Sequence, residues 1–274
     1  MLLASLQEMF DVRGKSTIVT GGASGIGRAY AEVMAEHGAR VCIFDVDRAG
    51  LDQTVKELSQ AGGEVWGQIV DVTDRPAMAR AFDAVAEKHG RIDVVFANAG
   101  IDAGPGFLSP EGDRNEDGAI DQMDEAVWDR VIAVNLTGVF FTLRNAARHM
   151  KASGGGRIIV TSSVAAQINE AIVGTPYMPA KAGVDHLVRN AAMELGTFGI
   201  HVNCISPGPF MTNIAGGRLK NPADRAAFEA QSLIGRIGHP DDIKGLALFL
   251  ASPASSYVTG AQYVIDGGSR LRIM

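Results

Sequence analysis

The chain has 274 residues, of which 46% are hydrophobic and 20% charged, the composition of a soluble globular protein with a sizeable core. Its net charge of −6 and the lack of any Lys- and Arg-rich run argue against a nucleic-acid-binding surface. The start, MLLASLQEMF, lacks the basic and apolar regions of a signal peptide, and no run approaches the roughly 18 apolar residues of a membrane span. We therefore expect neither a nucleic-acid nor a membrane partner.

Short β-branched runs alternate along the chain with longer helical patterns. The predicted strands are residues 16–20, 40–46, 64–70, 92–97, 157–163, 200–206 and 261–266. The predicted helices are residues 27–38, 48–60, 74–89, 123–151, 178–198 and 241–252. Alternation of this kind, with nearly continuous apolar strands, is typical of a parallel sheet that helices cover on both faces. The sequence therefore predicts an α/β fold, a doubly wound parallel sheet (Rossmann fold), as a single domain over residues 1–274.

Two cysteines lie inside strand-like runs, Cys42 in VCIFD and Cys204 in VNCIS. Free cysteines of this kind behave as small core hydrophobes. Without a secretion signal, two buried thiols indicate a reducing cytoplasm, not a disulfide framework. We expect both to be buried and unpaired, in a cytoplasmic protein.

The stretch TGGASGIG, residues 20–27, places three glycines between the first predicted strand and the first predicted helix. Glycines at 21, 25 and 27 let the backbone turn sharply and pass close to a ligand. The N-terminus of the helix that follows offers free N–H groups to a pyrophosphate. A lone glycine-rich loop is a weak signal, but this strand–loop–helix context favours a dinucleotide site.

Asp45 ends the second predicted strand, about 20 residues further on, where an acid can hydrogen-bond both hydroxyls of an adenosine ribose. A 2′-phosphate at that place would meet an unpaired carboxylate, so the sequence favours NAD over NADP. Arg48 lies nearby in the sequence and would soften this exclusion, whereas loop position 24 is Ser24, not a basic residue. Taken alone, Asp45 is equally well read as a turn residue at the end of a strand.

The Gly-x-x-x-Gly-x-Gly spacing of this loop resembles the short-chain dehydrogenase/reductase family, and the resemblance runs from about residue 10 to 270. Eight motifs occur in the family's order. They are TGGASGIG at 20–27, DV at 71–72, NAG at 98–100, NLTG at 135–138, SS at 162–163, YMPAK at 177–181, PGPFMT at 207–212 and YVTGAQYVIDGG at 257–268. One such motif would be weak evidence, but eight in order are highly specific.

The resemblance implies a role for each matching residue. Residues implied to bind the cofactor are Gly21, Ser24, Gly25, Ile26, Gly27, Asp45, Val46, Asp71, Val72, Asn98, Ala99, Gly100, Tyr177, Lys181, Pro207, Gly208, Phe210 and Thr212. Among them, Asp71 and Val72 would flank the adenine, and Phe210 and Thr212 would hold the nicotinamide carboxamide. The implied catalytic tetrad is Asn135, Ser163, Tyr177 and Lys181.

These residue types suit the oxidation of a secondary alcohol, which needs a base near the hydroxyl while hydride leaves the carbon. A free tyrosine has a pKa near 10, and bringing it to pH 7 takes about 4 kcal/mol. Lys181, four residues after Tyr177, shares its helix face and would lower that pKa together with the positive nicotinamide. Ser163 would polarise the substrate oxygen. Asn135 would hold a water that connects Lys181 to solvent.

Pro179 stands between the tyrosine and the lysine of YMPAK. Proline suits the first turn of a helix but not its interior, and it disfavours helical geometry at the residue before it. We therefore expect the helix to begin near Tyr177 or to be distorted there.

The segment between NAG and NLTG is longer than is usual in the family, and we treat residues 101–124 as an extended loop insertion on the rim of the active site. Part of it approaches the spacing of a calcium-binding loop. The residues concerned are Asp113, Asn115, Asp117, Gly118, Ala119 (carbonyl), Asp121 and Asp124. The last position carries Asp where the pattern wants Glu, and the preceding segment is not helical. We favour a solvated acidic loop and predict no metal.

Residues 208–238 are predicted to form a lid over the substrate, with Gly216 and Gly217 as a hinge. The pocket beneath it is expected to be mainly apolar. Its candidate residues are Ile168, Val173, Phe210 and Met211, with Asn169 and Glu170 as possible polar contacts.

The sequence thus predicts an NAD-dependent oxidoreductase that acts on a secondary alcohol or the matching ketone, with apolar or cyclic character. Two alternatives stay open: an NADP(H)-dependent ketone reductase, and a non-catalytic nucleotide-binding scaffold on the same fold. The family resemblance also implies a homotetramer, built on helices 123–151 and 178–198 and on the C-terminal strand.

Overall fold

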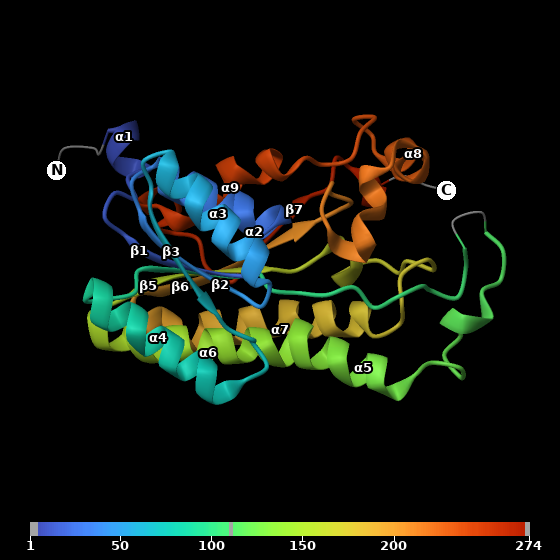
Figure 1. Ribbon diagram of the computed structural model, residues 1–274, viewed down its shortest axis with the longest axis horizontal. Coiled ribbons are helices and arrows are strands. Elements are labelled where there is room, and N and C mark those ends of the chain that lie inside the picture. The colour runs from blue at the N-terminus through green and yellow to red at the C-terminus, as the bar shows by residue number, and fades with distance from the viewer. Residues whose placement is uncertain (1–4, 110–111, 272–274) are drawn as a thin grey trace.

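Seven parallel strands form one sheet in the computed structural model, which describes residues 5–109 and 112–271 (Figure 1). The strands are β1 (Ser16–Thr20), β2 (Arg40–Asp45), β3 (Glu64–Ile69), β4 (Val94–Ala97), β5 (Gly156–Thr161), β6 (Ile200–Pro207) and β7 (Gln262–Ile265). Their order is β3-β2-β1-β4-β5-β6-β7. The order reverses between β1 and β4, and such a reversal opens a crevice at the carboxyl ends of the strands.

Helices cover both faces of this sheet, so the predicted doubly wound α/β fold is confirmed. The helices are α1 (Leu6–Met9), α2 (Gly25–Glu36), α3 (Arg48–Gln60), α4 (Arg75–His89), α5 (Glu125–Ile132), α6 (Val139–Ser153), α7 (Tyr177–Leu195), α8 (Pro222–Gln231) and α9 (Lys244–Ala251). Helices α2, α3 and α9 lie on one face, and α4, α6 and α7 on the other (Figure 1).

Alternating side chains of the central strands pack into two separate hydrophobic cores, one on each face of the sheet. Ile18 and Val95 point to the face covered by α4, α6 and α7, whereas Val19 and Phe96 point to the face of α2, α3 and α9. Because successive side chains of a strand point to opposite faces, a strand buried on both sides must be apolar at every position. This explains why the strands read as continuous apolar runs.

Helix α4 shows how local sequence sets the element boundaries. The carboxylate of Asp74 accepts a hydrogen bond from the backbone N–H of Ala77 at 2.9 Å, which satisfies one of the free donors of the first turn. Pro76 occupies that same turn, where its missing N–H costs nothing. Gly90 ends the helix with a left-handed φ of 79°, a conformation that glycine adopts without strain.

Both cysteines are buried and unpaired, as expected. Cys42 packs in the core with Gln68 against its sulfur, and Cys204 lies beside Asp185. Burial raises the pKa of each thiol to about 12, so neither carries the thiolate that a nucleophile requires. Their role in this structure is packing.

The single helix predicted for residues 123–151 is three consecutive segments. A stretch of π-helix, Ala133–Gly138, joins α5 to α6 and contains Asn135. Such stretches occur mostly as single-turn bulges and frequently at functional sites. From Glu125 to Ser153 the run is long and apolar enough to cross a membrane by length and composition alone, yet it packs on the sheet and on α7. Only 39% of its most apolar window is buried within the chain, which leaves apolar surface uncovered.

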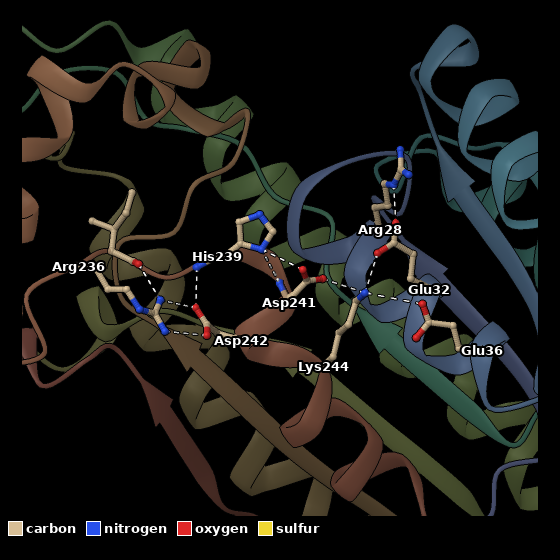
Figure 2. Close-up of polar contacts among 9 residues, drawn as sticks. Arg28, Glu32, Glu36, Arg236, His239, Asp241, Asp242 and Lys244 are labelled. Atoms are coloured by element: carbon tan, nitrogen blue, oxygen red, sulfur yellow. Dashed lines mark hydrogen bonds and ion pairs between the residues drawn. The ribbon is translucent and has the colours of Figure 1, made fainter. Parts of the chain in front are cut away.

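An ion-pair network joins α2 to the start of α9 and to the turn before it (Figure 2). Lys244 lies 3.0 Å from Glu32 and 2.8 Å from Asp241. Beside it, Asp242 pairs with Arg236 at 2.6 Å. Paired networks of this kind are better ordered than isolated surface pairs. The network fixes the chain just after residue 238 to the helix that follows the glycine loop.

Candidate active site

A cavity of about 650 Å³ lies at the carboxyl ends of the strands, where the strand order reverses. Every residue predicted to bind the cofactor lines it, from Gly21 after β1 to Thr212 after β6. Three catalytic candidates, Ser163, Tyr177 and Lys181, line the same cavity, whereas Asn135 does not. The structure thus brings together residues that are far apart in the sequence.

The glycine loop fits a pyrophosphate. Gly21 and Gly25 adopt positive φ angles of 64° and 55°, which other residues rarely adopt. A Cβ on Gly27 would collide with the carbonyl oxygen of Gly21, so the turn closes only with glycine there. Ser24 makes no side-chain hydrogen bond to the first turn of α2. The N–H groups of that turn are therefore available to an anion.

Asp45 is held at the mouth of this cavity by two backbone donors. One carboxylate oxygen accepts a hydrogen bond from Ala23 N–H at 2.9 Å, and the other accepts one from Asp47 N–H at 3.0 Å. Each oxygen keeps a second lone pair for a ligand hydroxyl. Arg48, which the sequence left as a possible phosphate partner, is exposed and is not among the residues that line the cavity.

Asn98 ties the glycine loop to the neighbouring strands. Its amide donates to the carbonyl oxygens of Thr20 and Gly21, both at 3.1 Å. Its side-chain oxygen accepts a hydrogen bond from the hydroxyl of Thr161 at 3.0 Å. The amide therefore fixes the floor of the cavity across β1, β4 and β5.

Lys181 is buried beneath the cavity. Its Nζ donates to the carbonyl oxygen of Thr161 at 2.9 Å and lies 5.7 Å from the ring centroid of Tyr177. Burial lowers the pKa of the Lys181 ammonium to about 8, although the charge of Asp185 acts to raise it. Lys181 therefore titrates close to physiological pH.

Helix α7 begins at Tyr177, as Pro179 required. Pro176 stands at the N-cap, and Pro179 falls in the first turn, where a missing N–H is tolerated. Tyr177 and Lys181 therefore lie on one face of regular helix, one turn apart.

The electrostatic balance at Tyr177 differs from the sequence-based expectation that its pKa is lowered. The pKa of the phenol is raised to about 12. Burial is the main cause and the charges of Glu170 and Asp102 act in the same direction, whereas a hydrogen bond with Ser163 acts against them. The expectation considered the ammonium of Lys181 and the positive nicotinamide. It omitted the desolvation of the phenol and the two carboxylates, because they come from loops whose positions the sequence did not reveal.

Asn135 is fully buried, and its side chain forms two hydrogen bonds with the backbone of Ile101. Its amide donates to the carbonyl oxygen of Ile101 at 2.9 Å, and its oxygen accepts from Ile101 N–H at 2.8 Å. A Cβ on Gly100 would come within 3.4 Å of the same side chain. Asn135 therefore fixes the start of the insertion against the π-helix, close to Lys181.

A second cavity of about 320 Å³ adjoins the first. The residues that line both are Asp102, Ser163, Tyr177, Gly208, Pro209, Ile214 and Leu219. Apart from Ser163 and Tyr177, the lining of the second cavity is mostly apolar: Gly104, Pro105, Val164, Ala165, Ile172, Val173, Gly208, Pro209, Ile214, Leu219 and Phe228. Two carboxylates, Asp102 and Glu170, complete it.

Sequence reasoning found only part of this second cavity. It named Val173 and Glu170, which do line it. Ile168, Asn169, Phe210 and Met211 were also expected there, but they are not among its lining residues; Phe210 lines the cofactor cavity instead. The residues it missed are Asp102, Ile172, Ile214, Leu219 and Phe228. Asp102 could have been found, because it lies two residues after the strand-end motif NAG; the others lie in the segment before α7 and in the predicted lid beyond residue 212, where no such motif occurs.

The insertion 101–124 forms one wall of this cavity by pairing with the segment before α7. Pro105 forms an antiparallel bridge with Val173, and Gly106 N–H donates to the carbonyl oxygen of Ile172 at 3.2 Å. A Cβ on Gly118 would collide with the carbonyl oxygen of Gly106, so backbone packs directly on backbone. This contact supports the expectation that the insertion lies on the rim of the site.

The residues considered as a calcium loop serve other purposes. Asn115 donates its side-chain amide to Gly106 at 2.8 Å, and Asp124 caps α5 by accepting from Ala126 N–H at 2.8 Å. Within residues 5–109 and 112–271, no three His, Cys, Asp or Glu side chains gather as they would around a metal ion.

The two ends of the predicted lid, residues 208–238, are hydrogen-bonded to each other, and we call this pairing its base. Phe210 and Gly238 form a parallel bridge, and Met211 N–H donates to the carbonyl oxygen of Gly238 at 2.8 Å. Gly216 and Gly217, the predicted hinge, have φ angles of 67° and 76°. The lid carries Ile214, Leu219 and Phe228 of the second cavity between these fixed ends.

The fold and this pair of cavities define a dinucleotide-binding oxidoreductase. The family profile described as enoyl-(acyl carrier protein) reductase matches residues 21–270. The cis-4-hydroxycyclohexanecarboxylate dehydrogenase of Sinomonas cyclohexanicum is 40% identical over 92% of this chain and 94% of its own. The L-rhamnose 1-dehydrogenase (NAD(P)(+)) of Azotobacter vinelandii is 37% identical over 93% of this chain and 96% of its own.

Solved structures agree with these relatives. A 7α-hydroxysteroid dehydrogenase complexed with NADH and 7-oxo glycochenodeoxycholic acid matches with a TM-score of 0.86 and 32% identity, over 97% of this chain and 98% of its own. The chain belongs to the short-chain dehydrogenase/reductase family. It is an oxidoreductase of CH–OH groups that uses a nicotinamide cofactor.

Substituting Gly118 should damage the rim without unfolding the protein. In Gly118→Ala, the new methyl group collides with Gly106, and overpacking of this kind costs about 1–3 kcal/mol. We expect a lower melting temperature and a lower kcat/KM, with unchanged cofactor affinity. Calorimetry and steady-state kinetics measure these quantities.

Gly245→Ala is the matched control for this substitution. Gly245 lies exposed in α9 with open space around it, so alanine there should be neutral or stabilise the helix. Equal changes of melting temperature and kcat/KM in Gly118→Ala and Gly245→Ala would contradict the packing role of Gly118.

Proposed function

We propose that this protein oxidises a secondary alcohol to a ketone with NAD⁺, or runs the reverse reaction with NADH. The observation that supports this is the position of Ser163 and Tyr177, which line both the cofactor cavity and the adjoining cavity. A substrate oxygen in the second cavity would contact both hydroxyls while its carbon faces the first. Tyr177, Lys181, Ser163 and Asn135 then act as the catalytic set that the family resemblance implies.

The proton and the hydride leave the alcohol in different directions. The Tyr177 phenolate takes the O–H proton, and the O–H electron pair forms the C=O bond. The residues that line the first cavity would hold a nicotinamide cofactor, which would supply the acceptor for the hydrogen and electron pair of the C–H bond. Ser163 donates to the substrate oxygen and polarises it. Lys181 and the positive charge of the oxidised cofactor favour the phenolate, against the burial that raises the Tyr177 pKa.

NAD is the cofactor that the ribose end of the cavity favours. The carboxylate of Asp45 would accept hydrogen bonds from both ribose hydroxyls and repel a 2′-phosphate. Of the described residues that line this cavity, only Lys181 is basic, and its Nζ is bonded to Thr161. A relative named for both NAD and NADP keeps an NADP(H)-dependent ketone reductase as the second candidate.

Cofactor fluorescence titration tests this preference directly. The wild type should bind NADH more tightly than NADPH. In Asp45→Ala, the loss of charged hydrogen bonds should weaken NADH binding by about tenfold or more and leave NADPH binding less affected. Arg48→Ala, which changes an exposed neighbour of the site, is the control and should leave both affinities unchanged. Tighter binding of NADPH by the wild type would favour the second candidate.

Replacing the phenol separates an enzyme from a scaffold. Tyr177→Phe removes the proton acceptor while keeping the ring, so kcat should fall by about 10²–10⁴-fold. NADH affinity should stay within about twofold, because the phenol makes only one of many cofactor contacts. Stopped-flow or steady-state assays over a panel of secondary alcohols measure this. Wild-type protein that binds NADH yet oxidises no member of the panel would support the non-catalytic scaffold.

We also propose a cytoplasmic homotetramer built on α5, α6 and α7. The apolar run Glu125–Ser153 is mostly unburied within the chain, and Met193 on α7 is 79% exposed. Covering such surface with a second copy would remove it from water. The lid, residues 208–238, would close over the substrate in each copy.

Sedimentation velocity at micromolar concentration tests the assembly. The wild type should sediment as a tetramer, and Met193→Glu should yield smaller species, because it places a charge in the contact. Leu6→Glu changes a residue of similar exposure on α1 and should leave the tetramer intact. A monomeric wild type would refute the proposal.

A further inference from the structure

The second cavity holds two carboxylates, at positions that no family motif identified. Asp102 follows the strand-end motif at the start of the insertion, and Glu170 lies in the segment before α7. Both line the cavity together with Tyr177. Tyr177 is the residue that would contact the reacting hydroxyl, so both acids line the cavity that this hydroxyl would enter.

Neither carboxylate has a partner in the part of the chain that the structure describes. Asp45 and Asp71, in the cofactor cavity, both accept backbone N–H groups. By contrast, within residues 5–109 and 112–271 no hydrogen bond or ion pair engages the side chain of Asp102 or Glu170. Burial alone acts on Glu170 and raises the pKa of its carboxyl. A half-buried carboxylate without a partner is costly, and a ligand that donates hydrogen bonds would relieve that cost.

The charge in this cavity is not balanced by a cation. Of the described residues that line it, none is Lys, Arg or His. Lys181 opens onto the cofactor cavity and donates to Thr161. A carboxylate on the substrate would therefore meet two negative charges and no positive one, which discriminates strongly against anionic substrates.

The rest of the cavity suits the apolar faces of a ring. Ile172 and Val173 lie on the wall formed with the insertion, and Ile214, Leu219 and Phe228 lie on the lid. Apolar walls with a few polar groups are typical of sites that bind a small molecule in one orientation. The acids would set that orientation by contacting a polar group away from the reacting carbon.

We propose that Asp102 and Glu170 select a neutral cyclic alcohol with at least one further hydroxyl group, a cyclic diol or polyol, and reject substrates that carry a carboxylate. The acids accept hydrogen bonds from the further hydroxyl, while Ser163 and Tyr177 contact the reacting one. This rests on the proposed function, since it names the substrate class for the same site. A neutral substrate is favoured over an ammonium, because the oxidised cofactor already places a positive charge beside the reacting carbon.

A series on one ring tests the inference: cyclohexanol, 1,4-cyclohexanediol, 4-hydroxycyclohexanecarboxylate and 4-aminocyclohexanol. For the wild type, kcat/KM for the diol should exceed that for cyclohexanol by about tenfold, the value of one hydrogen bond to a charged group. The carboxylate should be the poorest substrate. If the amine were the best, the acids would be an ammonium site and the inference would be overturned.

Variants of Glu170 show whether the acids cause this ranking. Glu170→Leu should abolish the advantage of the diol over cyclohexanol. Glu170→Gln and Asp102→Asn should each raise kcat/KM for the carboxylate by about tenfold, because each removes one repelling charge. Glu125→Gln, which removes an exposed charge on α5 outside the cavity, is the matched control. An unchanged ranking in every variant would overturn the inference.

Two further readouts separate this inference from its premise. Removing the charge of Glu170 should lower the phenol pKa, so the alkaline rise of kcat/KM should move to lower pH in Glu170→Gln. Thermal shifts of the NADH complex with the four compounds rank binding without turnover. The predicted ranking of binding with no turnover would support the inference and overturn the proposed function. Turnover with a different ranking would support the proposed function and overturn the inference.

Discussion

The site depends on one line of hydrogen bonds at the point where the strand order reverses. The amide of Asn98 donates to the carbonyl oxygens of Thr20 and Gly21 and accepts from the hydroxyl of Thr161. The carbonyl oxygen of Thr161 accepts in turn from Lys181. The glycine loop and the buried ammonium are therefore fixed relative to each other through β1, β4 and β5. A position set by backbone groups of a central sheet is rigid, which is what preorganisation of a catalytic group requires.

That rigidity places ionisable groups where water cannot stabilise their charges. Burial lowers the pKa of Lys181 to about 8 and raises that of Tyr177 to about 12, so both groups are shifted toward their neutral forms. A protonated phenol is a proton donor, as ketone reduction requires. The positive charge of an oxidised cofactor acts in the opposite sense and favours the phenolate that alcohol oxidation requires. The protonation state of Tyr177 is therefore coupled to the redox state of the bound nicotinamide.

The fold followed from local patterns in the sequence, and the residues that the family resemblance implied for the cofactor line one cavity. Strand ends such as Gly21 and Asp45 are marked by motifs, and parallel strands bring those ends to one edge of the sheet. Even the start of α7 followed from Pro179 alone. The π-helix around Asn135 was not foreseen, since no residue there breaks the helical pattern. The raised pKa of Tyr177 was not foreseen either, because it depends on the burial of the phenol and on carboxylates from two loops that meet only in three dimensions.

The two walls of the second cavity are held in place in different ways. The wall with Asp102 and Glu170 is held by backbone packing, since a Cβ on Gly174 would collide with the carbonyl oxygen of Ala103. Leu219 and Phe228 belong to the predicted lid, residues 208–238. This segment is fixed at its base by the bridge between Phe210 and Gly238, and again at Leu233, whose N–H donates to the carbonyl oxygen of Gly267 at 2.9 Å. If residues 208–238 act as the proposed lid, polar selection on the fixed wall would not depend on its motion, whereas apolar contact would be gained on closure. A substrate that satisfies the acids would then be oriented before closure removes water from the reacting carbon.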